Sequence, residues 1–234
     1  MIKPRTGSGG WRNRVIHSDG ERAQWDNEFE KMPAITQEIV NGLAASVCCL
    51  ADGSKAVAVA VNEQLLRGEG AEAYGFCGSV TPLRHPLTGT MIRYAEKIAG
   101  ASGCVGTVGI DFVLGEEAWA IEINPRFQGT LDTVELATGL NLFDAHVQAC
   151  RGILPGSTPP AQQYAARTIL FADHDITIGS DFSSLAPIIA DIPPAGSFIE
   201  DGKAIVSVYG VGRDRASALA SLDKHISRVN QYVR

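Results

Sequence analysis

The chain lacks the features that would place it in a membrane or outside the cell. Its longest apolar runs, such as residues 56–61, have only the length of a strand, so none can cross a bilayer. The first residues pass from Lys3 and Arg5 directly into glycines, whereas a signal peptide needs an apolar stretch there. We therefore expect a cytoplasmic protein with no membrane partner.

Excess positive charge and paired cysteines are missing as well. The net charge of −6 argues against nucleic acid as a partner, because binding to phosphate backbones needs dense lysine and arginine. The five cysteines are odd in number and lack the paired spacing of a metal site. We expect them to be reduced, and small molecules to be the partners.

What the sequence does contain is enough apolar material for a core. With 45% hydrophobic residues among 234, the chain should form one large domain or two smaller ones. Local patterns predict an α+β fold. Helices are expected over 18–32, 88–101, 133–151 with a break at 139–141, and 214–232. Strands are expected over 34–40, 45–50, 56–61, 167–172 and 204–209, and 66–82 is expected to be a long irregular loop.

The segment 107–127 is the most informative part of the chain, because it predicts a hairpin with one apolar and one acidic face. Side chains of a strand point to opposite faces in alternation. In the first strand the apolar face holds Ile110, Phe112 and Leu114, and the other face holds Gly109, Asp111 and Val113. In the second strand the apolar face holds Trp119, Ile121 and Ile123, and the other face holds Glu122 and Asn124.

The connection 115–117 decides which of these faces coincide. It is short and begins with glycine, which is typical of an antiparallel hairpin. A loop of two or four residues brings the two apolar faces together, whereas a loop of three would bury half of each set wrongly. We therefore expect a two- or four-residue loop that gathers Asp111, Glu122 and Asn124 on one surface.

Two carboxylates and an amide oxygen are ligands that suit Mg²⁺, with Mn²⁺ as an alternative. A simpler interpretation is a half-exposed hairpin whose polar face meets water. Arg126 follows Asn124 after Pro125, which ends the strand, and this favours a site over a plain surface. Arg126 could instead form a structural ion pair with Glu122 or Glu135.

A second candidate site lies at the N-terminus, where Lys3 precedes the glycine-rich loop 6–10. Glycines let backbone N–H groups approach phosphate oxygens closely. The order differs from a Walker P-loop, in which the lysine follows the glycines. By itself the loop could be a flexible turn, and Lys3 a solvated terminal lysine.

Taken together, these pieces resemble the ATP-grasp superfamily of ligases, in the branch of biotin carboxylase and carbamoyl phosphate synthase. The resemblance covers nearly the whole chain in order and spacing. It is carried by Ile2–Gly10, Gln37–Val40, Asp111, Glu122–Arg126, Gln128–Gly152 and Tyr209–Arg215.

The resemblance implies two antiparallel lobes that clamp ATP, followed by a small β-rich domain. The expected boundaries are 1–44 for a partial small lobe, 45–154 for the large lobe with the metal site, and 164–234 for the C-terminal domain. It implies ATP binding by Lys3, Thr6, Gly7, Ser8, Gly9, Gly10, Gln37, Glu38, Ile39 and Val40. It implies Mg²⁺ binding by Asp111, Glu122 and Asn124, and catalytic roles for Arg126 and Lys3.

The implied reaction is ATP-dependent ligation of a carboxylate to an amine through an acyl phosphate. The positions 128–130 carry no acidic residue, unlike the carboxylase branch, so bicarbonate activation is not expected. Archaeal ligases such as tyramine–glutamate ligase are the nearest type. The N-terminal domain of the superfamily is not seen, so we expect a truncated chain or half of a split enzyme, with a separate N-terminal half or a second copy as partner. The alternative is an inactive nucleotide-binding remnant or regulatory subunit.

Overall fold

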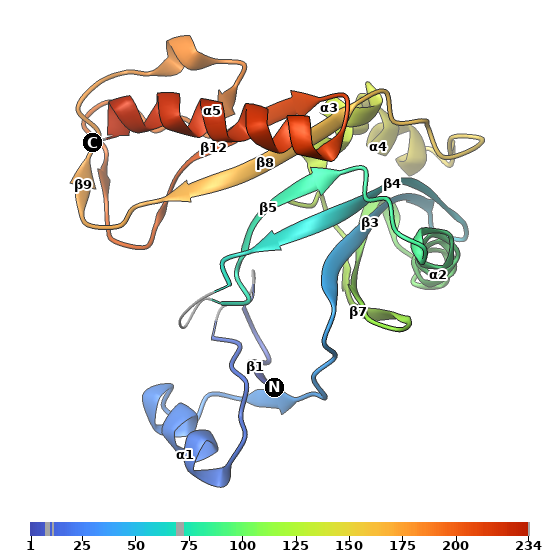
Figure 1. Ribbon diagram of the computed structural model, residues 1–234. Coiled ribbons are helices and arrows are strands. Elements are labelled where there is room, and N and C mark those ends of the chain that lie inside the picture. Colours follow the sequence, from blue (N-terminus) through green and yellow to red (C-terminus); the bar gives the residue numbers. More distant parts are fainter. Residues whose placement is uncertain (8–9, 11, 69–72, 234) are drawn as a thin grey trace.

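A computed structural model describes residues 1–7, 10, 12–68 and 73–233 (Figure 1). Its main feature is an eight-stranded sheet in which all neighbouring strands are antiparallel. The strand order across this sheet is β10 (Ile189–Ala190), β12 (Ala204–Gly212), β8 (Tyr164–Phe171), β5 (Phe76–Thr81), β4 (Ala56–Leu66), β3 (Leu43–Asp52), β6 (Val105–Leu114) and β7 (Ala118–Asn124).

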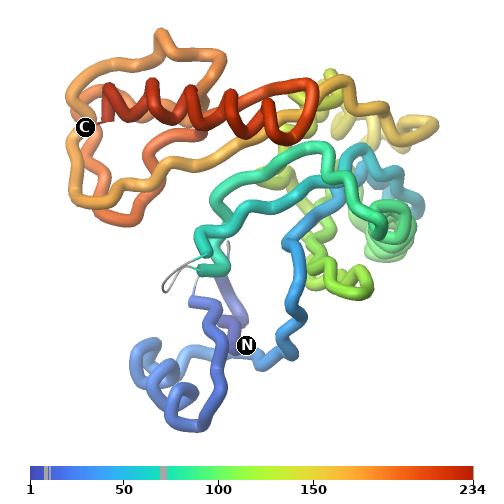
Figure 2. Tube along the Cα trace, in the orientation of Figure 1, coloured from blue at the N-terminus to red at the C-terminus, as the bar shows by residue number. Residues whose placement is uncertain are grey.

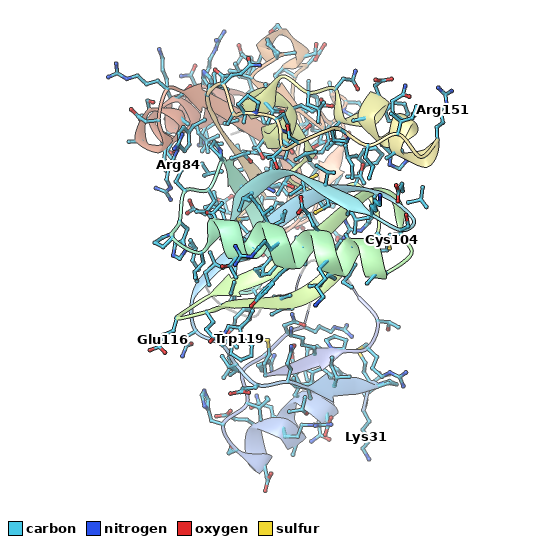
Figure 3. The ribbon with its side chains drawn as sticks, turned by 90° about the vertical axis from the view of Figure 1, so that its right-hand side faces the viewer. Lys31, Arg84, Cys104, Glu116, Trp119 and Arg151 are labelled. Atoms are coloured by element: carbon cyan, nitrogen blue, oxygen red, sulfur yellow. The ribbon has the colours of Figure 1, made fainter. Side chains whose placement is uncertain are left out.

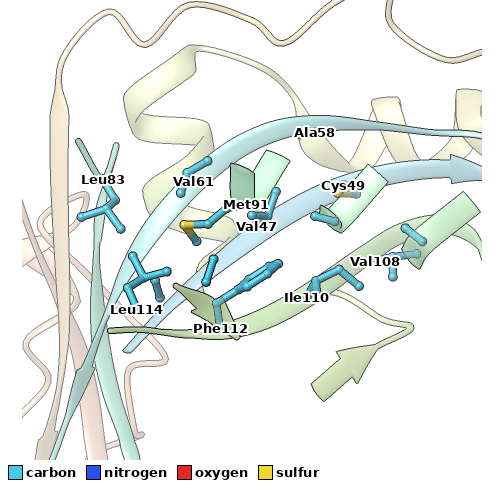
Figure 4. Close-up of a cluster of buried hydrophobic side chains, with 14 of the residues drawn as sticks. Val47, Cys49, Ala58, Val61, Leu83, Met91, Val108, Ile110, Phe112 and Leu114 are labelled. Atoms are coloured by element: carbon cyan, nitrogen blue, oxygen red, sulfur yellow. The ribbon is translucent and has the colours of Figure 1, made fainter. Parts of the chain in front are cut away.

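Helices cover both faces of the sheet. One face packs against α2 (Thr88–Ala101) and α5 (Arg215–Val233), and the other against α3 (Leu131–Thr138) and α4 (Leu142–Cys150). Under α2, Met91 meets Val47 and Phe112 in a layer of buried apolar side chains (Figure 4). Under α5, Leu222 packs with Val80 in a second buried cluster, so apolar side chains line this face under both helices.

The first forty residues form a separate small unit that projects from the sheet (Figure 2). In this unit β1 (Ile2–Pro4) pairs with β2 (Ala34–Thr36), and α1 (Asp19–Glu28) lies between them in sequence. Ile2 and Trp25 are its fully buried apolar side chains among the described residues. A second two-stranded sheet, of β9 (Ile176–Thr177) and β11 (Phe198–Ile199), lies in the C-terminal part, as does the short 3₁₀ turn η2 (Ser183–Leu185).

The four expected helices are present. Ser18 caps α1 by accepting a hydrogen bond from the Glu21 amide at 3.2 Å, but the helix ends at Glu28 rather than 32. The helix expected over 88–101 has those bounds. The segment 133–151 is broken as expected, because Gly139 adopts a φ of 72° and the Asn141 side chain caps α4.

Two expectations for strands are wrong. The strand expected over 34–40 stops at Thr36 and pairs with β1, so it does not join the meander of β3 and β4. The loop expected over 66–82 contains β5, which lies inside the main sheet between β4 and β8. This strand has no clear alternation because its buried polar residues, Ser79 and Thr81, bond to Thr133 of α3 instead of facing water.

The C-terminal strands extend the main sheet. Within it, β8 pairs with β5 on one side and with β12 on the other, so residues 164–234 share a sheet with the preceding part of the chain. A bidentate ion pair between Arg215 of α5 and Glu63 of β4, with N···O distances of 2.6 and 2.8 Å, adds a further link. Across the described ranges, no helix is both long and apolar enough to cross a membrane.

Candidate active site

The β6–β7 hairpin has a register that the sequence did not suggest. Its connection is the three-residue segment 115–117, with Leu114 opposite Ala118, so the expected loop of two or four residues is wrong. A β-bulge at Ile121 then shifts the register by one residue. Beyond the bulge Asp111 lies opposite Glu122, and Gly109 lies opposite Asn124. The bulge therefore places Asp111, Glu122 and Asn124 on one face despite the loop length.

The three-residue loop alters the apolar face of β7, because it places Ala118 and not Trp119 on the face of Leu114. Ala118 joins the core beside Leu114, whereas Trp119 is 50% exposed at the margin of the sheet (Figure 3). Ile121 and Ile123 are also exposed, because β7 is the edge strand of the sheet. The expectation that these three residues form a buried face is thus wrong.

Asp111 is the centre of a hydrogen-bonded group. Its Oδ2 accepts from Asn124 Nδ2 at 3.0 Å, and its Oδ1 accepts from Gln64 Nε2 of β4 at 3.0 Å. Gln64 reaches across β3, where the residue opposite Asp111 is the small Ser46. Arg126 Nη2 in turn donates to Asn124 Oδ1 at 3.1 Å. The amide of Asn124 therefore connects the carboxylate to the guanidinium.

The pKa of Asp111 is raised to about 6, from an ordinary value of 3.8. Burial is the main cause, and the nearby charge of Glu122 is the second. The hydrogen bonds from Gln64 and Asn124 and the charge of Arg126 act in the opposite direction. Asp111 is partly buried and Glu122, on the opposite residue of β7, is exposed. Two such carboxylates, with the Asn124 side chain next to them, supply oxygen ligands of the kind that Mg²⁺ binds.

This shift predicts that the free energy of unfolding decreases as the pH rises from about 4 to about 6 in the absence of metal. Asp111 is protonated in both states below pH 3.8 and ionised in both above 6, so the folded state loses stability between these values. By linkage the loss is at most about 3 kcal/mol. Urea unfolding at pH 4 and 7 measures it, and Asp111→Asn should remove this contribution. Equal pH slopes for both proteins would contradict the prediction.

The turn after β7 folds back beside the site. Arg126 Nη1 donates to the carbonyl of Phe127 at 3.0 Å, and Gln128 donates to the carbonyl of Arg126. A side chain at Gly109 would collide with Gln128, so this close approach depends on glycine. Among the described residues no carboxylate lies within ion-pair distance of Arg126, including those of Glu122 and Glu135. Within the same ranges, three of its five N–H donors remain for another group.

The residues expected to bind ATP lie elsewhere, in the small unit and its connection to the sheet. Lys3 is half-buried on β1 opposite Ile35, and no described contact joins it to the acidic hairpin. Thr6 and Gly7 are exposed, and a side chain at Gly10 would collide with the Tyr74 carbonyl. Ser8 and Gly9 lie outside the described residues. Gln37, Glu38, Ile39 and Val40 form the irregular connection between β2 and β3.

A row of polar residues extends from the hairpin across the same face of the sheet. Cross-strand pairs place Asp111 beside Ser46, Ser46 beside Asn62, Ser79 beside Arg167 and Arg167 beside Tyr209. Directly opposite residues of antiparallel strands share a face. The row therefore connects the acidic hairpin at one edge to the C-terminal strands near the other.

Arg167 is the buried charge of this row. Its Nη1 donates to the Gly129 carbonyl at 2.5 Å, and its Nη2 donates to Ser207 Oγ at 2.7 Å. The carboxylates of Asp132 and Asp191 lie 3.6 and 3.4 Å from its nitrogens. Gly129 follows Arg126 by three residues, so Arg167 holds the turn of the acidic hairpin against the C-terminal strands.

The sequence reasoning missed Gln64 and the Arg167 group. A signal for Arg167 was present, because a charged residue within the apolar strand 164–171 must be paired if it is buried. No comparable signal marks Asp132 or Asp191, which become neighbours of Arg167 only through the folding of distant segments.

Comparison with known proteins agrees with this fold. The family model of the ATP-grasp domain matches residues 1–130, and the chain belongs to this family. Its members are ATP-dependent carboxylate–amine ligases, which in general use ATP and Mg²⁺.

Curated proteins of similar sequence include the following two relatives. The arginine-specific large chain of carbamoyl phosphate synthase from Lactiplantibacillus plantarum is 25% identical over 188 residues, covering 74% of this chain and 18% of that protein. An uncharacterized protein of Methanocaldococcus jannaschii is 26% identical over 213 residues, covering 89% of this chain and 50% of that protein. The chain thus spans half or less of the length of these curated relatives.

Solved structures share the fold at low identity. A biotin carboxylase–β-γ-ATP complex from Campylobacter jejuni has a TM-score of 0.71 at 16% identity, covering 97% of this chain and 56% of that one. N5-carboxyaminoimidazole ribonucleotide synthetase from Thermus thermophilus has a TM-score of 0.68 at 17% identity, covering 99% and 61%. The ATP-grasp fold expected from the sequence is confirmed.

Proposed function

We propose that this chain supplies the catalytic part of an ATP- and Mg²⁺-dependent ligase that joins a carboxylate to an amine through an acyl phosphate. The observation that carries this proposal is the juxtaposition of Asp111, Glu122 and Asn124 on one face, with Arg126 bonded to Asn124. Membership of the ATP-grasp family supports the reaction class. The donor chemistry supports the metal.

In this proposal Asp111, Glu122 and Asn124 hold Mg²⁺, which when bound neutralises charge on the triphosphate. Arg126 directs its remaining N–H donors at the transferring phosphoryl group. Its position is fixed by Asn124 Oδ1 and the Phe127 carbonyl, so little reorganisation is needed when charge develops. Gln64 orients the Asp111 carboxylate from the side of β4.

The small unit supplies the other half of the nucleotide site. Lys3 would contact the α- and β-phosphates, and the loop from Thr6 to Gly10 would cover the triphosphate. The connection from Gln37 to Val40 would lie along the adenine. The small unit and the acidic hairpin belong to different sheets, which is the arrangement that a two-sided clamp requires.

The reaction then has two balanced steps. A carboxylate oxygen attacks the γ-phosphorus, the bond to the β-phosphate oxygen breaks, and ADP leaves with an acyl phosphate formed. The amine nitrogen attacks the acyl carbon, inorganic phosphate leaves with the former carboxylate oxygen, and the nitrogen loses a proton. Because phosphoryl transfer depends on positioning and charge neutralisation, no covalent contribution from the protein is required.

Hydroxylamine trapping tests the acyl phosphate. The chain is incubated with ATP, MgCl₂, hydroxylamine and a panel of carboxylates, and hydroxamate and ADP are measured. We expect equal amounts of both products with a subset of the panel, and a loss of about tenfold or more in Glu122→Gln because a charged metal ligand is removed. With an ¹⁸O-labelled carboxylate and an amine, one ¹⁸O should appear in the phosphate.

The alternative of a nucleotide-binding remnant gives a different result. Such a chain would bind ATP with Mg²⁺ but release no ADP and form no hydroxamate with any carboxylate of the panel. This outcome would refute the ligase proposal. If ATP did not bind at all, with or without Mg²⁺, both functions would be wrong for this chain.

A further inference from the structure

A pocket lies beside the start of α5, where the chain passes from β5 to α2 (Figure 1). Its volume is about 290 Å³. Pockets that hold small molecules begin at roughly 300 Å³, so the space suits a small ligand. Two arginines and a histidine line it: Arg84 and His85 from the connection between β5 and α2, and Arg215, the first residue of α5.

The pocket is on the opposite face of the sheet from the acidic hairpin. Consecutive residues of β4 show this, because side chains of a strand alternate between its faces. Glu63 lines the pocket and lies opposite Val80, which belongs to the buried cluster under α5. Its neighbour Gln64 donates to Asp111 on the other face. A molecule in this pocket is therefore separated from Asp111 by the sheet itself.

The arginines give the pocket one unpaired positive charge. Arg84 makes no hydrogen bond and no ion pair within the described part of the chain. Arg215 is neutralised by Glu63, whose two carboxylate oxygens accept from its Nε at 2.8 Å and its Nη2 at 2.6 Å. Glu63 is only 8% exposed, and both of its oxygens are occupied. The charge of Arg84 is therefore left for a ligand with a single negative charge.

The same side chains offer N–H donors that the described residues do not use. Nη1 of Arg215 donates to none of them, since Glu63 accepts from Nε and Nη2. His85 Nδ1 accepts a hydrogen bond from the Leu87 amide at 3.2 Å, so in the neutral ring the proton is on Nε2. The Nε2–H group has no partner among the described residues and is a further donor. Three side chains of the pocket can thus donate to an oxyanion.

The rest of the lining is mostly apolar. Leu43, Pro82, Leu83 and the ring of Tyr164 complete it. Leu43 is 36% exposed, so a ligand could cover apolar surface that now meets water. A few polar donors beside an apolar wall are typical of sites for small organic molecules.

We propose that this pocket binds a small organic carboxylate, separate from the carboxylate that reacts at the acidic hairpin. Arg84 pairs with the carboxylate through two parallel N–H···O bonds, and Arg215 and His85 donate to the same group. The apolar body of the ligand lies against Leu83 and Tyr164. A carboxylate balances the single charge of Arg84, whereas a phosphate monoester carries about −1.5 to −2 at pH 7 and would exceed it. This inference does not rest on the ligase function.

Tyrosine-ring NMR tests this site directly, because Tyr164 lines the pocket and the chain has only five tyrosines. In protein labelled on its tyrosine rings, Tyr164→Phe identifies the Tyr164 signals. Sodium benzoate is the probe, and benzamide is the control, since it has nearly the same shape without the charge. At constant ionic strength we expect the Tyr164 signals to shift saturably with benzoate alone. Acetate should need a concentration about tenfold or more higher, because it covers little of the apolar wall.

Arg84→Gln removes the unpaired charge without breaking a contact between described residues. The side chain is exposed, so the variant should fold normally, which the signals of the other four tyrosines check. We expect the benzoate concentration for half-saturation to rise about tenfold or more. Arg151→Gln is the matched control and should leave the titration unchanged. Arg151 is also exposed, but it follows α4 on the opposite face of the sheet, far from Arg84 (Figure 3).

Several results would each overturn the site: Tyr164 signals that do not move, that move equally with benzamide, or that respond equally in Arg84→Gln. Inorganic phosphate is titrated as well. If it saturated the Tyr164 shift at a lower concentration than benzoate, the pocket would bind phosphate groups and the carboxylate assignment would be wrong. The titrations contain neither ATP nor Mg²⁺, so a failure here leaves the ligase proposal standing, and a failure of the hydroxylamine assay leaves this site standing.

Discussion

Asn124→Ala is expected to abolish the dependence of ATP binding on Mg²⁺. Asn124 is buried, donates to Asp111 and accepts from Arg126, so alanine removes the group that holds both in place. Even outer-shell partners of metal ligands contribute about 10- to 100-fold to affinity, so we expect a loss of about 100-fold or more in the presence of Mg²⁺. Calorimetric titration of ATP with and without MgCl₂ measures the loss.

A matched control is available on the same face of the sheet. Asn62 is fully buried on β4 and makes two comparable hydrogen bonds, donating to Ser46 and accepting from Thr81. Asn62→Ala should lower the free energy of unfolding by about 1–3 kcal/mol, as Asn124→Ala also should, because buried partners lose hydrogen bonds. It should nevertheless retain the effect of Mg²⁺ on ATP binding. If both variants lost that effect equally, the metal assignment would be wrong.

Arg167→Met should destabilise the fold more than the loss of an exposed ion pair does. Methionine keeps much of the volume but leaves the Gly129 carbonyl and Ser207 without their donor. Asp132 and Asp191 lose their cation too, although their exposure lets water compensate part of that loss. We expect a decrease of about 3 kcal/mol in the free energy of unfolding, measured with urea.

Arg14→Met serves as the control for this effect. Arg14 forms a bidentate ion pair with Glu28 at 2.8 and 3.1 Å, but both side chains are partly in contact with solvent. Exposed pairs of this kind contribute little to stability, because solvent screens them. A loss in Arg167→Met no larger than in Arg14→Met would show that the buried arginine does not hold the two parts of the sheet together.

Some helices and strands could be predicted from neighbouring residues in the sequence, and others depend on long-range contacts. The helix at 88–101 and the break at Gly139 follow from periodicity and capping, which depend on neighbouring residues only. The bulge at Ile121 could not be predicted, because the three-residue loop and the core position of Ala118 decide it together. β5 was missed because its polar residues are satisfied by Thr133, which lies more than fifty residues away.

The residues of the candidate site also divide into those predictable from local sequence and those placed by tertiary contacts. Asp111, Glu122 and Asn124 could be grouped from alternation and motif order, even though the expected loop length was wrong. Gln64 could not be added, since it reaches Asp111 from a strand whose neighbours in the sheet are set by long-range pairing. The partners of Arg167 depend on such pairing too, although its place in an apolar strand was a signal. Short-range patterns therefore identified the acidic centre, and the tertiary fold supplied its surroundings.

The interior position of β8 in the main sheet determines where the chain can be shortened. The linker at 155–163 looks like a natural place to cut the chain, since it lacks regular structure. Removing residues 164–234 would make β5 an unpaired edge strand of the sheet. It would also expose Val80 to solvent, since Val80 belongs to the buried cluster under α5. A fragment ending at that linker should therefore aggregate rather than fold. Segments that look separable along the sequence share one sheet, so we expect them to unfold as one cooperative unit.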